Sequence, residues 1–285
     1  MLLLKQIADL QKYLNTLRAK GATIGFVPTM GALHKGHVSL VERSRAECQA
    51  TVVSIFVNPT QFNNAADLEK YPRTAADDIE LLSAARADVL FMPSIAEIYP
   101  NGMKQPQKFN FGKLDKVLEG QFRPGHFDGM SQVVYRLLEI VEPNKLYMGQ
   151  KDFQQFMIVR RMLEILKSET KIEMCRIVRE NDGLAMSSRN VRLTHADRLL
   201  APKIYEALQE ARNRIGSSGP REIQQLTLNR LKSESRFNVE YVEVVDGNTL
   251  MPIIDFRDSN SVVALTAVWL GEVRLIDNIV LKDSR

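Results

Sequence analysis

The sequence has few of the residues that build disulfide frameworks or metal centres. It contains two cysteines, Cys48 and Cys175, which lie far apart and form no CxxC pair. A disulfide-stapled fold is therefore not expected, and a reduced intracellular compartment is the expected setting. The four histidines and two cysteines never occur at zinc-ligand spacing, so we predict no protein-bound metal.

Long apolar runs and long charge runs are also missing. No apolar stretch reaches membrane-spanning length, and residues 1–5 are too short for a signal sequence. The net charge is only +4, and like charges gather no further than pairs such as Arg160-Arg161. We therefore expect a cytoplasmic protein without membrane or nucleic-acid partners, whose mild positive charge suits small anionic substrates.

Strand-like and helical segments alternate through the first 178 residues, which predicts an α/β fold. Apolar runs at 23–27, 51–57, 88–92, 145–148 and 171–178 predict strands. A helical pattern at 7–21 precedes them, and others at 35–49, 74–86, 129–141 and 153–167 lie between them. Such units build a parallel sheet flanked by helices, with ligands at the carboxyl ends of the strands.

The character of the sequence changes after residue 178. We expect helices at 194–214 and 221–233, then strands at 238–245, 261–270 and 272–281, with a turn at Gly271. This pattern predicts two domains: residues 1–178 form the larger α/β domain, and residues 179–285 form a small α+β domain.

A pair of histidines marks the clearest candidate site. His34 and His37 open a helix directly after a strand, where N–H groups and the positive helix end favour an anion. The helix dipole disfavours positive charge on both imidazoles, so we expect neutral donors. The alternative, that the histidines only cap the helix and face solvent, stays open at this point.

Three further polar clusters follow predicted strands or turns: Asn58 with Gln61, Lys151 with Asp152 and Gln155, and Ser187 with Ser188 and Arg189. Lys and Arg are fixed positive charges suited to phosphate oxygens. Each cluster alone has a structural explanation, as a surface ion pair, a solvated amide or a helix cap; Asp77-Asp78 most simply complements a helix dipole. Together, the clusters predict a phosphate clamp for phosphoryl or nucleotidyl transfer without a Walker A sequence.

Eight stretches resemble the pantothenate synthetase (pantoate–β-alanine ligase) family, whose HxGH signature nucleotidyltransferases and class I aminoacyl-tRNA synthetases share. The resemblance covers essentially the whole chain. The stretches are Val27-Pro28-Thr29-Met30-Gly31 with Leu33-His34-x-Gly36-His37, Ser54-Ile55-Phe56-Val57-Asn58-Pro59 with Gln61-Phe62, Tyr71-Pro72-Arg73, Glu97-Ile98-Tyr99-Pro100, Arg123-Pro124-Gly125-His126-Phe127, Gly149-x-Lys151-Asp152 with Gln154-Gln155, Gly183-Leu184-Ala185-Met186-Ser187-Ser188-Arg189-Asn190, and Trp269-Leu270-Gly271 with Arg274-Leu275-Ile276-Asp277-Asn278.

The resemblance implies a Rossmann-like domain, a smaller C-terminal lid domain and a homodimer. It also implies two chemical steps. The carboxylate of pantoate attacks the α-phosphorus of Mg²⁺-ATP and gives pantoyl adenylate and pyrophosphate. The amine of β-alanine then attacks the activated carbonyl, which gives pantothenate and AMP.

The family's site residues are carried over by motif. His37 is the implied proton donor, and the implied catalytic set is His37, His34, Lys151 and Arg189. The two histidines, Lys151, Ser187, Ser188 and Arg189 are implied to contact phosphates. Gln61 and Gln155 hold pantoate, and Gln61 also borders the β-alanine site. The implied ATP site comprises Met30, Gly31, Ala32, Leu33, His34, Lys35, Gly36, His37, Gly149, Gln150, Lys151, Asp152, Val178, Met186, Ser187, Ser188 and Arg189.

Two positions depart from the expected family pattern, and two other functions compete with this one. Gln150 stands where Glu is frequent and Gln132 where Thr is frequent, but neither removes a required charge. One rival is another adenylyl- or cytidylyltransferase with the same HxGH site, which the small uncharged polar pocket expected from the loop at 58–62 and Gln155 disfavours. The other is a nucleotide-sensing protein without turnover, which the joint presence of His37, Lys151 and Arg189 disfavours.

Overall fold

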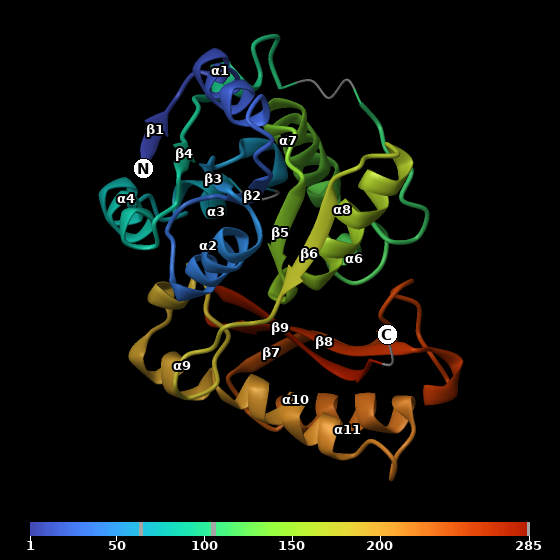
Figure 1. The fold of residues 1–285 in the computed structure, drawn as a ribbon. Helices are drawn as coiled ribbons and strands as arrows, with labels where there is room; N and C mark the ends of the chain where they lie inside the picture. Colours follow the sequence, from blue (N-terminus) through green and yellow to red (C-terminus); the bar gives the residue numbers. More distant parts are fainter. Residues whose placement is uncertain (63–64, 104–106, 284–285) are drawn as a thin grey trace. The chain divides into compact units, whose positions relative to one another are not determined.

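The computed structural model describes residues 1–62, 65–103 and 107–283, which fold into two compact units (Figure 1). The first unit comprises residues 1–149 and 155–176, and the second comprises residues 150–154 and 177–285. Among the described residues, no helix is both long and apolar enough to cross a membrane.

The first unit is built on a six-stranded parallel sheet, which confirms the predicted α/β class. The strands, in the order β1-β4-β3-β2-β5-β6, are β1 (Leu2–Leu4), β4 (Val89–Phe91), β3 (Ala50–Ile55), β2 (Ile24–Thr29), β5 (Lys145–Gly149) and β6 (Lys171–Cys175). The helices are α1 (Ile7–Arg18), α2 (Lys35–Glu47), α3 (Ala65–Glu69), α4 (Ala75–Ala84), α5 (Ile95–Ile98), α6 (Glu119–Phe122), α7 (His126–Val141) and α8 (Phe153–Ile165).

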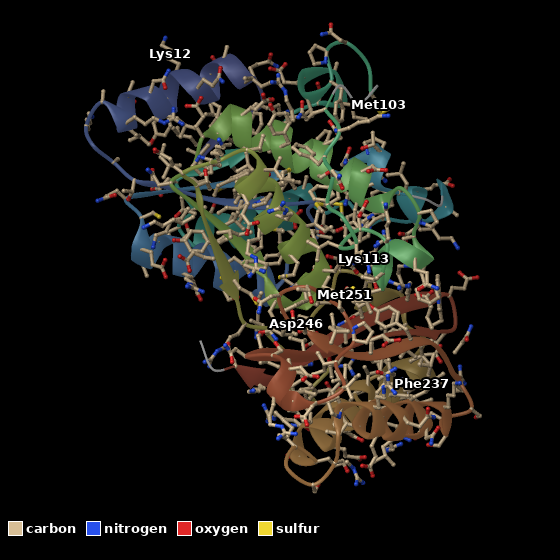
Figure 2. The ribbon with its side chains drawn as sticks, turned by 90° about the vertical axis from the view of Figure 1, so that its right-hand side faces the viewer. Lys12, Met103, Lys113, Phe237, Asp246 and Met251 are labelled. Carbon is tan, nitrogen blue, oxygen red and sulfur yellow. The ribbon has the colours of Figure 1, made fainter. Side chains whose placement is uncertain are left out.

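Helices pack on this sheet through alternate strand residues. Leu40 and Val41 of α2 and Leu82 of α4 share a buried cluster with Val27 and Leu90 of the sheet. Helix α7 packs on β2 and also contacts α1. On α1, Leu10 is buried whereas Lys12 projects outwards (Figure 2), as a surface helix requires.

The strand order places β2 at the point where the chain changes direction across the sheet. From β2, the chain adds β3 and β4 on one side and later adds β5 and β6 on the other. This is the Rossmann-like doubly wound arrangement, with the short edge strand β1 added beside β4. Ligands of such sheets bind outside the carboxyl ends of the strands at this switch point, here between β2 and β5.

The pairing of β2 with β5 ends early, and Pro28 explains why. The ladder joins Gly25 to Lys145 and Phe26 to Leu146 and extends no further. The carbonyl of Ile24 accepts from the N–H of Asn144 at 2.9 Å, so even-numbered residues of β2 direct their backbone groups towards β5. Pro28 falls on that side and has no N–H to donate. Beyond Phe26, therefore, β2 pairs with β3 alone.

The second unit has a three-stranded antiparallel sheet, β7 (Phe237–Asp246), β8 (Ser261–Leu270) and β9 (Val273–Asp283), in the order β7-β8-β9. Its helices are α9 (His195–Leu200), α10 (Lys203–Asn213) and α11 (Pro220–Lys232). Leu208 of α10 and Ile223 of α11 pack on Val244 and Val262 of the sheet. Phe237 at the start of β7 lies beside the helices (Figure 2), where it joins a second buried cluster.

Several predicted elements were wrong in extent or number. Residues 194–214 form two helices because Pro202 cannot donate within a continuous helix. Helix α7 begins at His126, directly after Gly125 at φ +79°. Strand β6 ends at Cys175. The short elements β1, α3 and α5 were not anticipated; β1 exists through its pairing with β4, which no local pattern reveals.

The carboxyl end of α2 is tied to β5 through Glu47. Its carboxylate accepts from Lys145 Nζ at 2.8 Å, Arg43 Nε at 2.9 Å and Tyr147 Oη at 3.0 Å. These bonds, of which the one from Lys145 contributes most, lower the pKa of Glu47 to about 2. Since His34 and His37 lie at the opposite end of α2, this anchor also restrains the helix that carries them.

The Glu47 anchor makes stability depend on pH. A depressed carboxyl pKa contributes stability above the unfolded-state value of about 4.3, and that contribution is lost as pH falls towards 2. Glu47→Gln should lower the free energy of unfolding by about 1 kcal/mol at pH 7, because water screens an exposed side chain. The deficit should shrink as pH falls below about 4 and should be largely lost at pH 2 in urea titrations. Glu42→Gln, on the same helix, serves as the control; equal pH profiles for both variants would contradict the anchor.

Candidate active site

The loop that follows β2 makes a tight turn over the end of β3. The Gly31 N–H donates to Thr29 Oγ1 at 3.2 Å, and that hydroxyl donates to the Ser54 carbonyl at 2.7 Å. Gly31 has φ +81°, and an added Cβ would lie 3.0 Å from both Ile55 Cγ2 and Asp78 Oδ2. Glycine is therefore required at position 31 by backbone conformation and by space.

A buried carboxylate on α4 holds this loop. Asp78 Oδ2 accepts from the Ala32 N–H at 2.9 Å, and Oδ1 accepts from the Leu33 N–H at 2.8 Å. Asp78 is only 2% exposed, and Thr74 Oγ1 also donates to it at 3.2 Å. The interpretation of Asp77-Asp78 as simple dipole complementarity therefore missed a residue that shapes the loop. The N–H groups of Ala32 and Leu33 therefore donate to a carboxylate of the protein itself.

His34 and His37 cap the amino end of α2 reciprocally. His34 Nδ1 accepts from the Gly36 N–H at 3.1 Å, and the His34 N–H donates to His37 Nδ1 at 3.3 Å. The ring centroids are 4.1 Å apart with the planes tilted by 42°. Both side chains are half-buried. The two imidazoles therefore form one unit at the helix N-terminus, next to Gly31 and Leu33.

This capping assigns the tautomer of each ring. An Nδ1 that accepts a backbone N–H carries no proton, so a neutral imidazole must carry its proton on Nε2. Each histidine then presents an Nε2–H donor from a helix end whose dipole already favours an anion. The capping role that the sequence left as an alternative is real, and it is also what orients the donors.

Gln61 follows β3, and its amide is oriented by Asn58. Asn58 Oδ1 accepts from the Thr60 N–H at 3.4 Å and from Tyr99 Oη at 2.9 Å, whereas Nδ2 donates to the Gly129 carbonyl at 3.1 Å. Two backbone groups of opposite polarity thus fix the Asn58 amide.

The fixed amide of Asn58 in turn orients the amide of Gln61. Asn58 Nδ2 donates to Gln61 Oε1 at 3.2 Å, so Gln61 Nε2 faces the other way and lies 3.0 Å from Met30 Sδ, a weak acceptor. Gln61 is 8% exposed. The contact joins the loop after β2 to the loop after β3, and it gives the Gln61 amide donor a weak acceptor as its partner among the described residues.

The position of Gln61 depends on helix α7. His126 Nδ1 donates to the Gln61 carbonyl at 2.8 Å. A Cβ on Gly129 would lie 2.2 Å from the Thr60 carbonyl oxygen, so only glycine lets α7 approach this closely. His126 and Tyr99 lie in stretches that carried the family resemblance, but no role had been assigned to them. Gly129 gave no signal beyond its residue type.

Gln155 and Gly149 lie near the second strand of the switch point. Gly149 is the last residue of β5, and no heavy atom of another described residue, its chain neighbours aside, lies within 4 Å of the position that a Cβ would take there. Gln155 is half-buried in the first turn of α8. Gly149 therefore ends the strand that diverges from β2, and Gln155 follows it.

In the second unit, residues 150–152 form one 3₁₀ turn whose carbonyls are held by β9. Asn278 Nδ2 donates to the carbonyls of Gln150 at 2.9 Å and Lys151 at 3.0 Å, and Gln150 Nε2 donates to Asn278 Oδ1 at 3.0 Å. The sequence predicted Gln150, Lys151 and Asp152 as site residues but did not predict their dependence on Asn278.

The predicted serine–arginine loop belongs to a hairpin of the same unit. The Met186 N–H donates to the Val178 carbonyl at 3.0 Å, which brings these two predicted site residues together. The Arg189 N–H donates to Ser187 Oγ at 3.2 Å, and Ser187, Ser188 and Arg189 are all half-buried. The turn therefore presents two hydroxyls and a guanidinium from a compact loop.

Comparison with known proteins places this arrangement in a family. A family model described as pantoate-beta-alanine ligase matches residues 2–280. The chain is 46% identical to the pantothenate synthetase of Porphyromonas gingivalis over 277 residues, 97% of this chain and 98% of that protein. It is 47% identical to the pantothenate synthetase of Bacteroides thetaiotaomicron over 283 residues, 99% and 100% of the two chains.

Solved structures agree over the full length. The pantothenate synthetase of Thermus thermophilus superposes with a TM-score of 0.93 at 38% identity, covering 99% of this chain and 100% of that chain. The pantoate-beta-alanine ligase of Francisella tularensis, complexed with beta-gamma ATP and beta-alanine, gives a TM-score of 0.81 at 38% identity, covering 99% and 98%.

Asp78→Asn should destabilise the protein by about 1–3 kcal/mol, because the new NH₂ group faces a backbone N–H and leaves it without an acceptor. The free energy of unfolding in urea measures this cost. Asp77→Asn, at the exposed neighbouring position on α4, is the matched control and should change stability by less than about 0.5 kcal/mol. Equal stabilities of the two variants would show that Asp78 does not hold the loop.

Proposed function

Because this chain belongs to the pantoate–β-alanine ligase family and is a pantothenate-forming ligase, we propose that it works in two steps through pantoyl adenylate. In the first step, a pantoate carboxylate oxygen bonds to the α-phosphorus of ATP, and the bond from that phosphorus to the bridging oxygen breaks, releasing pyrophosphate. In the second, the amine of β-alanine bonds to the acyl carbon, loses a proton and displaces AMP.

The histidine pair is the observation that carries this proposal. Two neutral Nε2–H donors at a helix N-terminus suit phosphate oxygens, and they lie beside a strand end at the sheet's switch point. We assign phosphate binding to His34 and, to His37, the catalytic hydrogen bond from Nε2–H to the phosphate oxygens that gain charge during adenylation. Residues 30–37 are proposed to line the remainder of this part of the ATP site.

Gln61 and Gln155 are assigned to pantoate. Since Asn58 occupies Gln61 Oε1, the amide nitrogen of Gln61 is the group offered to the substrate, and it suits the hydroxyl or carboxylate oxygens of pantoate. The thioether of Met30 is a weak acceptor, so it competes little with a substrate oxygen for that nitrogen. Gln61 also borders the proposed β-alanine site.

The remaining ATP contacts are assigned to the second unit and to Gly149. Lys151 and Arg189 supply fixed positive charge for the triphosphate, which gains negative charge on its leaving pyrophosphate during adenylation. Hydroxyl donors come from Ser187 and Ser188. The other proposed contacts are Gln150, Asp152, Val178 and Met186.

Mg²⁺ is proposed to enter as the complex with ATP. The described residues contain no group of three or more His, Cys, Asp or Glu side chains suited to a metal. The groups proposed for the phosphates are nitrogens and hydroxyls, which fit phosphate oxygens better than a hard cation, and Asp152 is the single carboxylate among the proposed contacts. Mg²⁺ would then be held by the phosphates and its own waters, and the protein would bind it through ATP.

Further features of the proposal rest on the family resemblance. We propose a cytoplasmic homodimer in which residues 1–178 bind ATP and pantoate and residues 179–285 act as a lid domain. Both cysteines are free thiols, as a reducing compartment requires. Sedimentation equilibrium tests the dimer, since a monomer at micromolar concentration would contradict it.

The proposal predicts the substrate dependence of AMP release. With Mg²⁺-ATP, AMP should form only when both pantoate and β-alanine are present, whereas pantoate alone should support exchange of labelled pyrophosphate into ATP. Another adenylyl- or cytidylyltransferase would keep the nucleotide in its product, and a nucleotide sensor would show neither reaction. AMP formation without pantoate or without β-alanine would contradict the proposed reaction.

His37→Ala should lower the rate of pantoate-dependent pyrophosphate exchange about 10²–10³-fold, the scale for one lost transition-state donor. ATP affinity should change much less, because other donors remain in the ground state. His195→Ala, an exposed histidine at the start of α9, is the matched control and should leave exchange unchanged. An unchanged exchange rate for His37→Ala would refute its assigned role.

ATP should slow amide hydrogen exchange across residues 186–190, because a bound phosphate gives the serine–arginine loop a partner that orders it. Residues 247–251, a turn elsewhere in the second unit, provide an internal control and should exchange equally with and without ATP. If both segments respond alike, the loop has no specific role in ATP binding.

A further inference from the structure

Asn278 is a buried amide at a position in β9 where packing within the sheet would favour an apolar side chain. It is 1% exposed, lies in β9 and pairs across the ladder with Leu265. An apolar side chain would suit the neighbouring strand, and a buried amide is costly unless it is fully hydrogen-bonded. The residue must therefore be explained by what its side chain contacts.

Among the described residues, the Asn278 side chain bonds only to the turn that carries Lys151. Nδ2 donates to the carbonyls of Gln150 and Lys151, and Oδ1 accepts from Gln150 Nε2. Two carbonyls and one amide donor thus converge on a single side chain within the second unit. A side chain with only acceptors or only donors could not satisfy all three.

A rigid base supports Asn278 from the preceding residue. Asp277 accepts from Arg179 Nη1 at 2.6 Å and Nη2 at 3.0 Å, and it also accepts from the Asn278 N–H at 2.7 Å. The guanidinium of Arg179 stacks 3.5 Å from the centroid of the Tyr205 ring. Burial raises the pKa of Asp277, and the Arg179 guanidinium opposes that shift. This bidentate pair fixes the backbone of β9 where Asn278 projects.

We propose that Asn278 is a positioning residue for the adenylation step, which it serves by fixing the turn at residues 150–152 and hence the base of the Lys151 side chain. The inference rests on the proposed role of Lys151 at the phosphates. Lys151 has a long, flexible side chain, so its reach is defined only if its backbone is held. An error of about 1 Å in such a group is enough to cost about 100-fold in rate.

The second step should be far less sensitive to Asn278. By then pyrophosphate has left, and the triphosphate charge that Lys151 is proposed to balance is gone. A merely structural role would instead lower both steps together, in proportion to the folded fraction. The ratio of the two half-reaction rates therefore separates positioning from stability.

Asn278→Leu is the informative substitution, because leucine is similar in size and suits the position opposite Leu265. It should lower pyrophosphate exchange about 10- to 100-fold and leave aminolysis of supplied pantoyl adenylate within about twofold. Asn278→Asp, which turns a donor towards two carbonyls into an acceptor, should be at least as impaired in exchange. Thr266→Val, which removes a buried hydrogen bond to Tyr241 in the same sheet, is the control and should not change the ratio.

A double-mutant cycle with Lys151→Met decides the question. If Asn278 acts through Lys151, the double variant Asn278→Leu/Lys151→Met should lose no more exchange activity than Lys151→Met alone. Losses that multiply, with Lys151→Met itself impaired, would overturn the positioning role and leave the proposed function intact. Equal losses in both half-reactions for Asn278→Leu would also overturn it. Normal exchange by Lys151→Met would instead refute the role of Lys151 at the phosphates.

Discussion

The divergence of β2 from β5 is the constraint on which the first unit's site depends. Parallel strands that paired to their ends would leave no room between them, but the β2–β5 ladder stops at Phe26 and Leu146. Pro28 enforces the stop because it cannot donate towards β5. The loop after β2 then turns over β3, where Thr29 and Asp78 satisfy its amides. The histidine cap begins only after this turn, so the end of β2 and the loop that follows it determine where the histidines lie.

The side chains proposed to bind the substrates are oriented by residues that are given no chemical role themselves. Asn58 is set by two backbone groups and in turn sets the amide of Gln61. In the second unit, Asn278 holds the carbonyls of the Lys151 turn. In both cases a buried asparagine supplies a donor and an acceptor at once, which no charged side chain can do. Through such residues, hydrogen bonds to the rigid backbone fix the direction of the side chains that are proposed to bind the substrates.

The sequence was enough to predict the parallel sheet, the antiparallel C-terminal strands and the family, which the structure and the comparisons confirm. Periodicity and strand–helix alternation are local patterns, so they can be read from the sequence alone. The break at Pro202 could have been predicted from the same rule that explains it. The roles of Asp78, Gly129 and Asn278 could not, because each depends on a contact with a segment more than 40 residues away.

The chemical character of the proposed donors differs between the two units in a way that fits a two-step reaction. The histidines offer neutral N–H groups whose protons are fixed on Nε2 by capping, whereas Lys151 and Arg189 carry full charge. Full charges stabilise pyrophosphate as it leaves but would also retain it. Neutral donors stabilise the same oxygens in the transition state and bind the departed product less strongly. A site made only of cations would therefore favour the first step at the expense of the second. In the proposed mechanism, a neutral pair at the start of α2 and cations on separately held turns would let adenylation proceed without trapping pyrophosphate.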